Sequence, residues 1–118
     1  MKTSQILLFL DDIRMPQDCV IYMNHSVELY LKEWTIVRSY GEFTKWIIEH
    51  GLPDVISFDH DLGDITNDIE LSGMDCAKWL VEYCMDNQTN LPQCIVHSQN
   101  PVGSANINGL FKSFLKNK

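Results

Sequence analysis

The sequence predicts one three-layer α/β domain, in which helices cover a parallel β-sheet. Short apolar, β-branched runs alternate along the chain with segments whose apolar residues recur at helical spacing. This alternation is typical of parallel sheets with right-handed crossovers. The chain has 118 residues and contains no linker or repeat, so we expect a single domain over residues 1–118.

Four runs are predicted to be strands, at residues 6–10, 35–37, 55–58 and 94–97. They are apolar at successive positions, as strands covered on both faces require. Numbered along the chain, these strands are expected in the order 2-1-3-4, which makes strands 1 and 3 neighbours.

Three segments have helical spacing, at residues 43–50, 74–84 and 107–115. Gly51 and Pro53 end the first of them. Residues 15–33 fit both a strand and a helix, and we favour a helix or helical turn. Residues 62–72 are expected to form a long acidic loop that is a lid, a source of ligands, or a solvated connection.

Charge and composition exclude several classes of protein. The net charge of −7 argues against phosphate-driven binding to long nucleic acid. No apolar run approaches the roughly 20 residues of a membrane span, so we expect a cytoplasmic protein without a membrane partner. The four cysteines form no C-x-x-C pair, and buried reduced thiols are expected rather than a zinc knuckle.

Polar clusters follow three of the predicted strands. Asp11 and Asp12 end the first strand, residues 59–61 end the third, and residues 97–100 end the fourth. Because the carboxyl ends of parallel strands share one edge, these clusters should meet in one crevice, where doubly wound sheets bind ligands.

The carboxylates of Asp11, Asp12, Asp59 and Asp61 would repel one another in such a crevice. A bound cation relieves this repulsion, and hard oxygen ligands suit Mg²⁺, Mn²⁺ or Ca²⁺. The alternative is that these aspartates only cap helices and turns. We favour a divalent metal, Mg²⁺ or Mn²⁺, because acid clusters in clefts concentrate at functional sites.

His60 and His97 lie at the same edge, where a neighbouring carboxylate favours the imidazolium. Each is a candidate general acid or a positive group facing phosphate, and the alternative is a structural role. A small phosphorylated ligand is the expected partner.

Arginine forks match phosphate oxygens, so Arg14 and Arg38 are candidate phosphate ligands, although pairing with the aspartates fits equally well. Ser98, Asn100 and the helix beginning near Gly103 offer further anion donors, or a plain helix cap.

Four motifs point to a known family. Phe-Leu-Asp-Asp-x-Arg-x-Pro spans residues 9–16, Asp-His-Asp-Leu-Gly 59–63, Gly-x-Asp-x-Ala-x-Trp-Leu 73–80, and His-Ser-x-Asn-Pro-x-Gly 97–103. In this order they resemble the cyclic-phosphate processing receiver-like family, a divergent branch of response-regulator receivers. The resemblance covers nearly the whole chain except residues 17–33. It implies a receiver-like (flavodoxin-like) fold, here without the fifth strand.

The resemblance also implies an activity, which is a metal-dependent phosphodiesterase acting on cyclic phosphates. Possible substrates are the 2′,3′-cyclic ends of RNA or nucleotides. Asp59, His60 and His97 would then be the catalytic residues.

Other functions stay open. A receiver-type phosphoacceptor would be phosphorylated at Asp59, but the missing fifth strand and its lysine argue against it. A noncatalytic sensor of a phosphate ligand and a Toprim-like nuclease are further alternatives.

Overall fold

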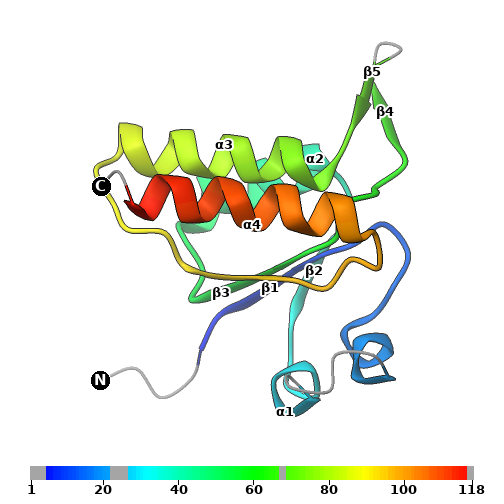
Figure 1. Cartoon of the computed structure of the whole chain (residues 1–118). Helices are drawn as coiled ribbons and strands as arrows, with labels where there is room; N and C mark the ends of the chain where they lie inside the picture. The colour runs from blue at the N-terminus through cyan, green and yellow to red at the C-terminus, as the bar shows by residue number, and fades with distance from the viewer. Residues whose placement is uncertain (1–4, 22–26, 67–68, 117–118) are drawn as a thin grey trace.

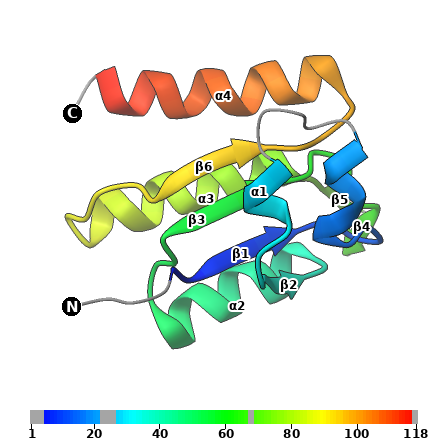
Figure 2. The same cartoon turned by 90° about the horizontal axis from the view of Figure 1, so that it is seen from below.

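The computed structural model describes residues 5–21, 27–66 and 69–116. Four parallel strands form the main sheet in the order β2-β1-β3-β6, which is the expected 2-1-3-4 when these strands are numbered along the chain. Within the described residues no fifth strand joins this sheet (Figure 2). The strands are β1 (Leu7–Leu10), β2 (Thr35–Val37), β3 (Val55–Phe58) and β6 (Gln93–Val96).

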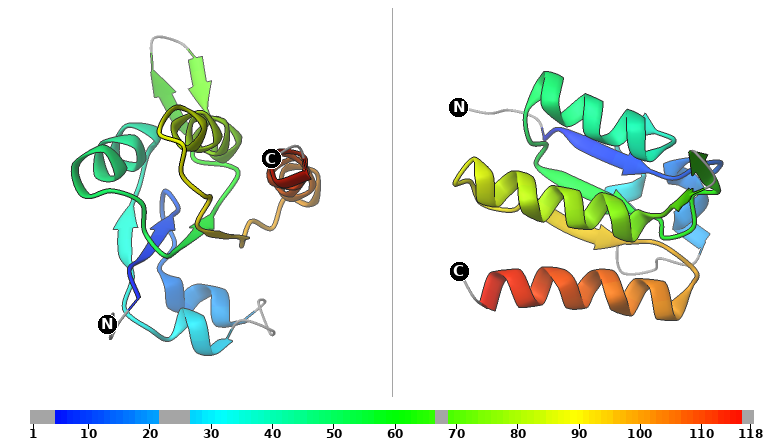
Figure 3. Two further views of the ribbon diagram at one scale, coloured as in Figure 1. Left: turned by 90° about the vertical axis from the view of Figure 1, so that its left-hand side faces the viewer. Right: turned by 90° about the horizontal axis from the view of Figure 1, so that it is seen from above.

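Helices lie on both sides of the sheet and complete the three predicted layers (Figure 3). On one side are α2 (Tyr40–His50), α3 (Gly73–Asp86) and α4 (Pro101–Lys116). On the other side are the short 3₁₀ helix η1 (Pro16–Ile21) and α1 (Val27–Tyr30). None of the helices in the described part of the chain is long and apolar enough to cross a membrane.

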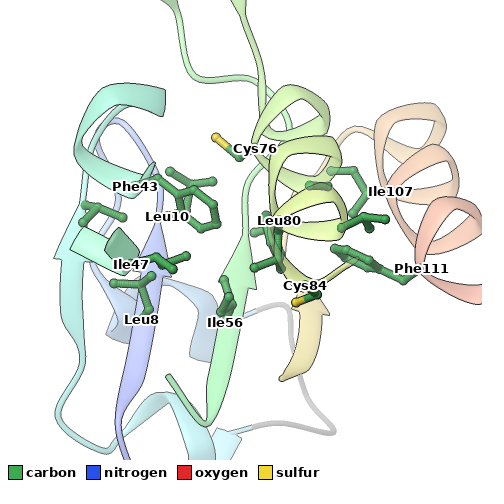
Figure 4. Close-up of a cluster of buried hydrophobic side chains, with 14 of the residues drawn as sticks. Leu8, Leu10, Phe43, Ile47, Ile56, Cys76, Leu80, Cys84, Ile107 and Phe111 are labelled. Carbon is green, nitrogen blue, oxygen red and sulfur yellow. The ribbon is translucent and has the colours of Figure 1, made fainter. Parts of the chain in front are cut away.

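Two cores hold these layers together. The larger lies between the sheet and the three long helices (Figure 4). In β1, Leu8 and Leu10 face this core, whereas Phe9 faces the second, smaller core beneath η1 and α1. The alternation explains why the strands are apolar throughout. Residues of the larger core that Figure 4 labels are Leu8, Leu10, Phe43, Ile47, Ile56, Cys76, Leu80, Cys84, Ile107 and Phe111.

The helix ends follow from local chemistry. Ser39 caps α2 by accepting a hydrogen bond from the Glu42 backbone N–H (3.1 Å). Gly51 ends α2 with a φ of 86°, as predicted from its position. The last helix begins at Pro101, earlier than expected, because proline fits the first turn of a helix, where no N–H donor is needed.

The expectation of a loop over residues 62–72 was wrong. This segment contains an antiparallel hairpin of β4 (Asp64–Thr66) and β5 (Ile69–Leu71), which projects beyond the helices (Figure 1). Each strand has only three residues, too few for a recognisable alternation. Glu70 is exposed, as expected of an acidic side chain in a solvated connection.

The ambiguous segment before β2 contains two helices. Both η1 and α1 are short, and residues 22–26 lie outside the described residues. The helical interpretation is therefore confirmed at residues 16–21 and 27–30. All four cysteines are free thiols, and Cys19 is buried beneath the sheet.

Candidate functional site

Three buried side chains form the centre of the site. Asp11, Asp59 and His97 follow β1, β3 and β6 in matching register, because Leu10, Phe58 and Val96 are aligned partners across the sheet. Side chains alternate along strands, so these three point to the face that η1 and α1 cover. One ligand atom from each lies within 4.8 Å of the others. The clustering expected from the sequence is observed.

The carboxylate of Asp11 is held at both oxygens. Its Oδ1 accepts hydrogen bonds from the backbone N–H groups of Ile13 (3.0 Å) and Arg14 (2.9 Å). Its Oδ2 lies 3.0 Å from His97 Nε2. Burial alone would raise the pKa of Asp11, but these hydrogen bonds outweigh it and lower the pKa to about 2.

His97 is fully buried, and both of its ring nitrogens have partners. Nδ1 lies 2.6 Å from Ser57 Oγ, and the ring stacks on Phe9 at 4.5 Å. Burial lowers the pKa of His97, although Asp11 opposes this effect. This placement favours a role in orienting Asp11 over direct contact with a substrate.

Ionisation of the Asp59 carboxyl is unfavourable in this site. Its side chain is only 6% exposed, and burial together with the charge of Asp11 raises its pKa to about 6. Burial and, more weakly, the charge of Asp11 also raise the pKa of Asp12. The site therefore holds more negative charge than its surroundings compensate.

An open pocket of about 560 Å³ lies over these acids at the carboxyl ends of the strands. Arg14 spans it, donating from Nη2 to Gln99 Oε1 (2.7 Å), while its Nη1 lies 4.0 Å from Asp11 Oδ2. Arg14 is the only cationic side chain among the described lining residues. These are Asp11, Asp12, Ile13, Arg14, Asp59, Asp61, Ser98, Gln99, Asn100 and Pro101.

Arg38, a predicted phosphate ligand, is not among those lining residues. Its guanidinium Nη1 donates to the backbone carbonyl oxygens of Asp11 (3.1 Å) and Arg14 (2.6 Å). Arg38 therefore joins the loop after β1 to the end of β2. Its guanidinium binds backbone carbonyl groups of the protein.

Asp61 and His60 form a pair at the rim of the pocket. His60 Nδ1 lies 2.9 Å from Asp61 Oδ1, and Asn100 Nδ2 donates to Asp61 Oδ2 (3.2 Å). The hydrogen bonds from His60 and Asn100 lower the pKa of Asp61. Asp61 lines the pocket, whereas His60 lies beside it against α4.

The cap expected at the last helix is observed. Asn100 Oδ1 accepts from the Gly103 N–H (3.0 Å), and Ser98 Oγ accepts from the Asn100 N–H (3.1 Å). Both capping side chains also line the pocket. Gly103 does not, and its role is to admit the His60 ring, because a Cβ there would lie 2.4 Å from His60 Cγ.

Two residues that were not predicted as site residues also shape the site. Ser57 lies inside β3 and contacts His97, and its signal is a polar residue in an otherwise apolar strand. Gly73 begins α3 where a Cβ would lie 1.8 Å from the Asp59 carbonyl oxygen. Its N–H donates to the His60 carbonyl oxygen (2.7 Å), so Gly73 joins the end of β3 to α3.

Comparison with known proteins identifies the fold and the family of the chain. A solved chimera, in which a trimeric coiled coil of yeast Spc42 is fused to another structure, matches with a TM-score of 0.55 and 15% identity. The match covers 91% of this chain and 60% of that one, and at this identity it shows the fold alone. No curated protein matches the chain. The model of the cyclic-phosphate processing receiver domain matches residues 6–113, and the chain therefore belongs to this family.

Proposed function

We propose that the site binds a divalent cation, Mg²⁺ or Mn²⁺, together with a small cyclic phosphodiester, and opens its ring to a monoester. The observation that carries this proposal is the convergence of Asp11, Asp12 and Asp59 at one open pocket, with Arg14 as the cation among its described lining residues. Family membership supports the cyclic phosphate as the substrate class.

The donor set fits a hard cation. Asp11, Asp12, Asp59 and Asp61 all line the pocket and would supply carboxylate oxygens. Burial and the charge of Asp11 raise the pKa of Asp59, and a bound cation would favour the ionised carboxylate. When bound, the cation would polarise the phosphate and activate water.

The remaining groups suit a small phosphate ligand. Arg14 would neutralise charge on the phosphate oxygens, as its guanidinium already reaches across the pocket. Ser98 has a hydroxyl proton to donate at the same wall. A free nucleotide or an RNA end is small enough to enter, while the net charge of −7 disfavours long nucleic acid.

Ring opening needs two proton transfers. The oxygen of a water molecule bonds to phosphorus, the bond from phosphorus to one sugar oxygen breaks, and that oxygen takes up a proton. The Asp59 carboxylate is suited to accept the water proton through an oxygen that the cation leaves free. His60, which lies beside the pocket and is held at Nδ1 by Asp61, is the candidate donor to the sugar oxygen.

The test is direct. The purified protein is mixed with a 2′,3′-cyclic nucleotide and Mg²⁺ or Mn²⁺, and the monoester is followed by phosphorus NMR. We expect Asp59→Asn to abolish turnover and Asp86→Asn, at the exposed end of α3, to retain it. No turnover by the unaltered chain with either cation, or equal turnover by the two variants, refutes the proposal.

A phosphoacceptor function is the second candidate, because Asp59 ends β3 of a receiver fold. Acetyl phosphate would then leave a phosphoryl group on Asp59, which mass spectrometry detects. The described lining residues include no lysine to contact such a group, which favours the phosphodiesterase. Calorimetry that shows tight binding without turnover would instead indicate a sensor.

A further inference from the structure

A chain of buried hydrogen bonds runs from α1 to the centre of the site. Tyr30 Oη lies 2.6 Å from Ser57 Oγ, and Ser57 Oγ lies 2.6 Å from His97 Nδ1. On the far side of the ring, His97 Nε2 lies 3.0 Å from Asp11 Oδ2. Each of the four residues is at most 1% exposed, so water does not compete for these bonds.

The number of protons available decides which group donates and which accepts in this chain of hydrogen bonds. A carboxylate only accepts, so His97 Nε2 must donate to Asp11. If Nδ1 also carried a proton, Ser57 would accept it and donate to Tyr30. The phenolic proton of Tyr30 would then have no acceptor among the described residues. A buried unpaired O–H is unfavourable, so the order that pairs every proton runs from Tyr30 through Ser57 to a bare Nδ1.

The rings around His97 support this order. Phe9 stacks on the imidazole with an interplanar angle of 8°, and Tyr30 meets it edge-on at 6.3 Å. These contacts fix the ring plane, so that Nδ1 stays aimed at Ser57. Burial raises the pKa of Tyr30 to about 12, which keeps its phenol protonated as a donor.

We propose that Tyr30 and Ser57 are positioning residues that hold His97 as its Nε2–H tautomer and thereby fix the carboxylate of Asp11 towards the cation. The link to the cation rests on the proposed function. The other tautomer would place a bare Nε2 against Asp11 Oδ2, and the two acceptors would repel. Backbone donors hold the other oxygen, so His97 decides the direction of the carboxylate.

The proposal gives α1 a purpose that no motif indicates. Tyr30 lies in residues 17–33, outside the four motifs, and α1 places it beneath the sheet (Figure 2). A substitution in this short helix would therefore change the site without touching a ligand.

The first test reads the tautomer in the metal-free chain. Long-range proton–nitrogen correlation of the ¹⁵N-labelled protein in EDTA should show a protonated Nε2 and a bare Nδ1 for His97. Asp11 still accepts from Nε2 in both variants, so we expect Nε2 to stay protonated, while the Nδ1 resonance shifts strongly in Ser57→Ala and less in Tyr30→Phe. Tyr83→Phe, whose ring stacks on Trp79 at 5.2 Å, is the matched control and should change nothing.

The second test measures Mn²⁺ affinity by calorimetry. Loss of an outer partner typically costs about 10- to 100-fold in metal affinity, and we expect this loss for Ser57→Ala. Tyr30→Phe should also weaken Mn²⁺ binding. This variant keeps the packed ring, so it still tests the proposal if Ser57→Ala does not fold. The expected result is weaker binding in these variants and unchanged binding in Tyr83→Phe.

The outcomes separate the two proposals. A wild-type imidazole that carries a proton on Nδ1 overturns the hydrogen-bond chain, as does an unchanged Nδ1 resonance in both variants. A shifted Nδ1 resonance with unchanged Mn²⁺ affinity overturns the positioning role. Absence of Mn²⁺ binding by the unaltered protein refutes the proposed function instead, and the tautomer alone then decides the chain.

Discussion

Replacing Asp59 with asparagine should stabilise the metal-free protein above about pH 6. The pKa of Asp59 is raised from 3.8 to about 6 by burial and by the charge of Asp11. A carboxyl with a raised pKa contributes stability below about pH 3.8, where both states are protonated at this group, and that contribution is lost as the pH rises through about 6. The native aspartate is therefore a destabilising charge at neutral pH.

The size of the effect follows from the shift. A rise of about two pKa units corresponds to about 3 kcal/mol of unfavourable free energy once the group is ionised. Asp59 is only 6% exposed, so solvent screening reduces this little. Asparagine keeps the shape without the charge, and we expect a gain of up to about 3 kcal/mol near pH 8 and almost none near pH 4.

Asp11→Asn is the matched control, because its shift has the opposite sign. Its pKa is lowered to about 2, so its stability is present above about pH 3.8 and is lost as the pH falls through about 2. We expect this variant to lose about 2 kcal/mol near pH 8. Urea unfolding in EDTA at both pH values measures the two variants.

The reasoning fails if Asp59→Asn is no more stable than the native chain near pH 8, or if its effect is equal at both pH values. A neutral effect of Asp11→Asn near pH 8 would show that the hydrogen bonds from His97 and the backbone do not stabilise the ionised carboxylate.

Further predictions concern the cation and the backbone. Mn²⁺ at about 100 times its Kd should stabilise the chain by about 2.7 kcal/mol in thermal unfolding, and Asp59→Asn should reduce this gain. Gly73→Ala should lose about 3 kcal/mol or more in urea unfolding, because its methyl would lie 1.8 Å from the Asp59 carbonyl oxygen. Gly41→Ala should stabilise the chain by up to about 1 kcal/mol, because its methyl would lie 3.9 Å from the nearest atom, Ser39 Oγ. Arg38→Met should cost about 1–3 kcal/mol by unpairing two carbonyl groups, and should weaken Mn²⁺ binding.

The sequence predicts the sheet and its edge well, for a physical reason. Parallel strands are buried on both faces, so they stand out as apolar runs, and right-handed crossovers leave few strand orders. The polar residues that end these runs must then meet at one edge. Asp11, Asp59 and His97 could be placed together on this basis alone.

Features set by loop paths could not be predicted. Arg38 and Arg14 both follow strands and both match phosphate chemically, yet only Arg14 lines the pocket. The turn after β1 presents carbonyl oxygens to Arg38, and no local pattern encodes that path. The helical spacing of residues 27–34 indicated a helix, but nothing in it indicated that Tyr30 reaches Ser57 beneath the site.

Two residues follow each of the strands β1, β3 and β6 at the site. Because side chains alternate in direction, these residues lie in two rows. Asp11, Asp59 and His97 form an inner row, buried on the face covered by η1 and α1. Each is followed by a more exposed residue, Asp12, His60 or Ser98, and these form an outer row in the loops.

The inner row explains why the site needs support from beneath. Phe9 and Ser57 lie on the same face, two residues before Asp11 and Asp59. Phe9 supplies a ring and Ser57 a hydroxyl group, and both contact His97. An apolar side chain in place of Ser57 would leave His97 Nδ1 buried without a donor, which costs free energy and loosens the imidazole. The polar residue Ser57 inside the apolar strand β3 is thus a consequence of the acid cluster at the strand ends. The buried carboxylate of Asp11 keeps its charge because His97 donates a hydrogen bond to it. His97 in turn needs a donor at Nδ1, which Ser57 supplies.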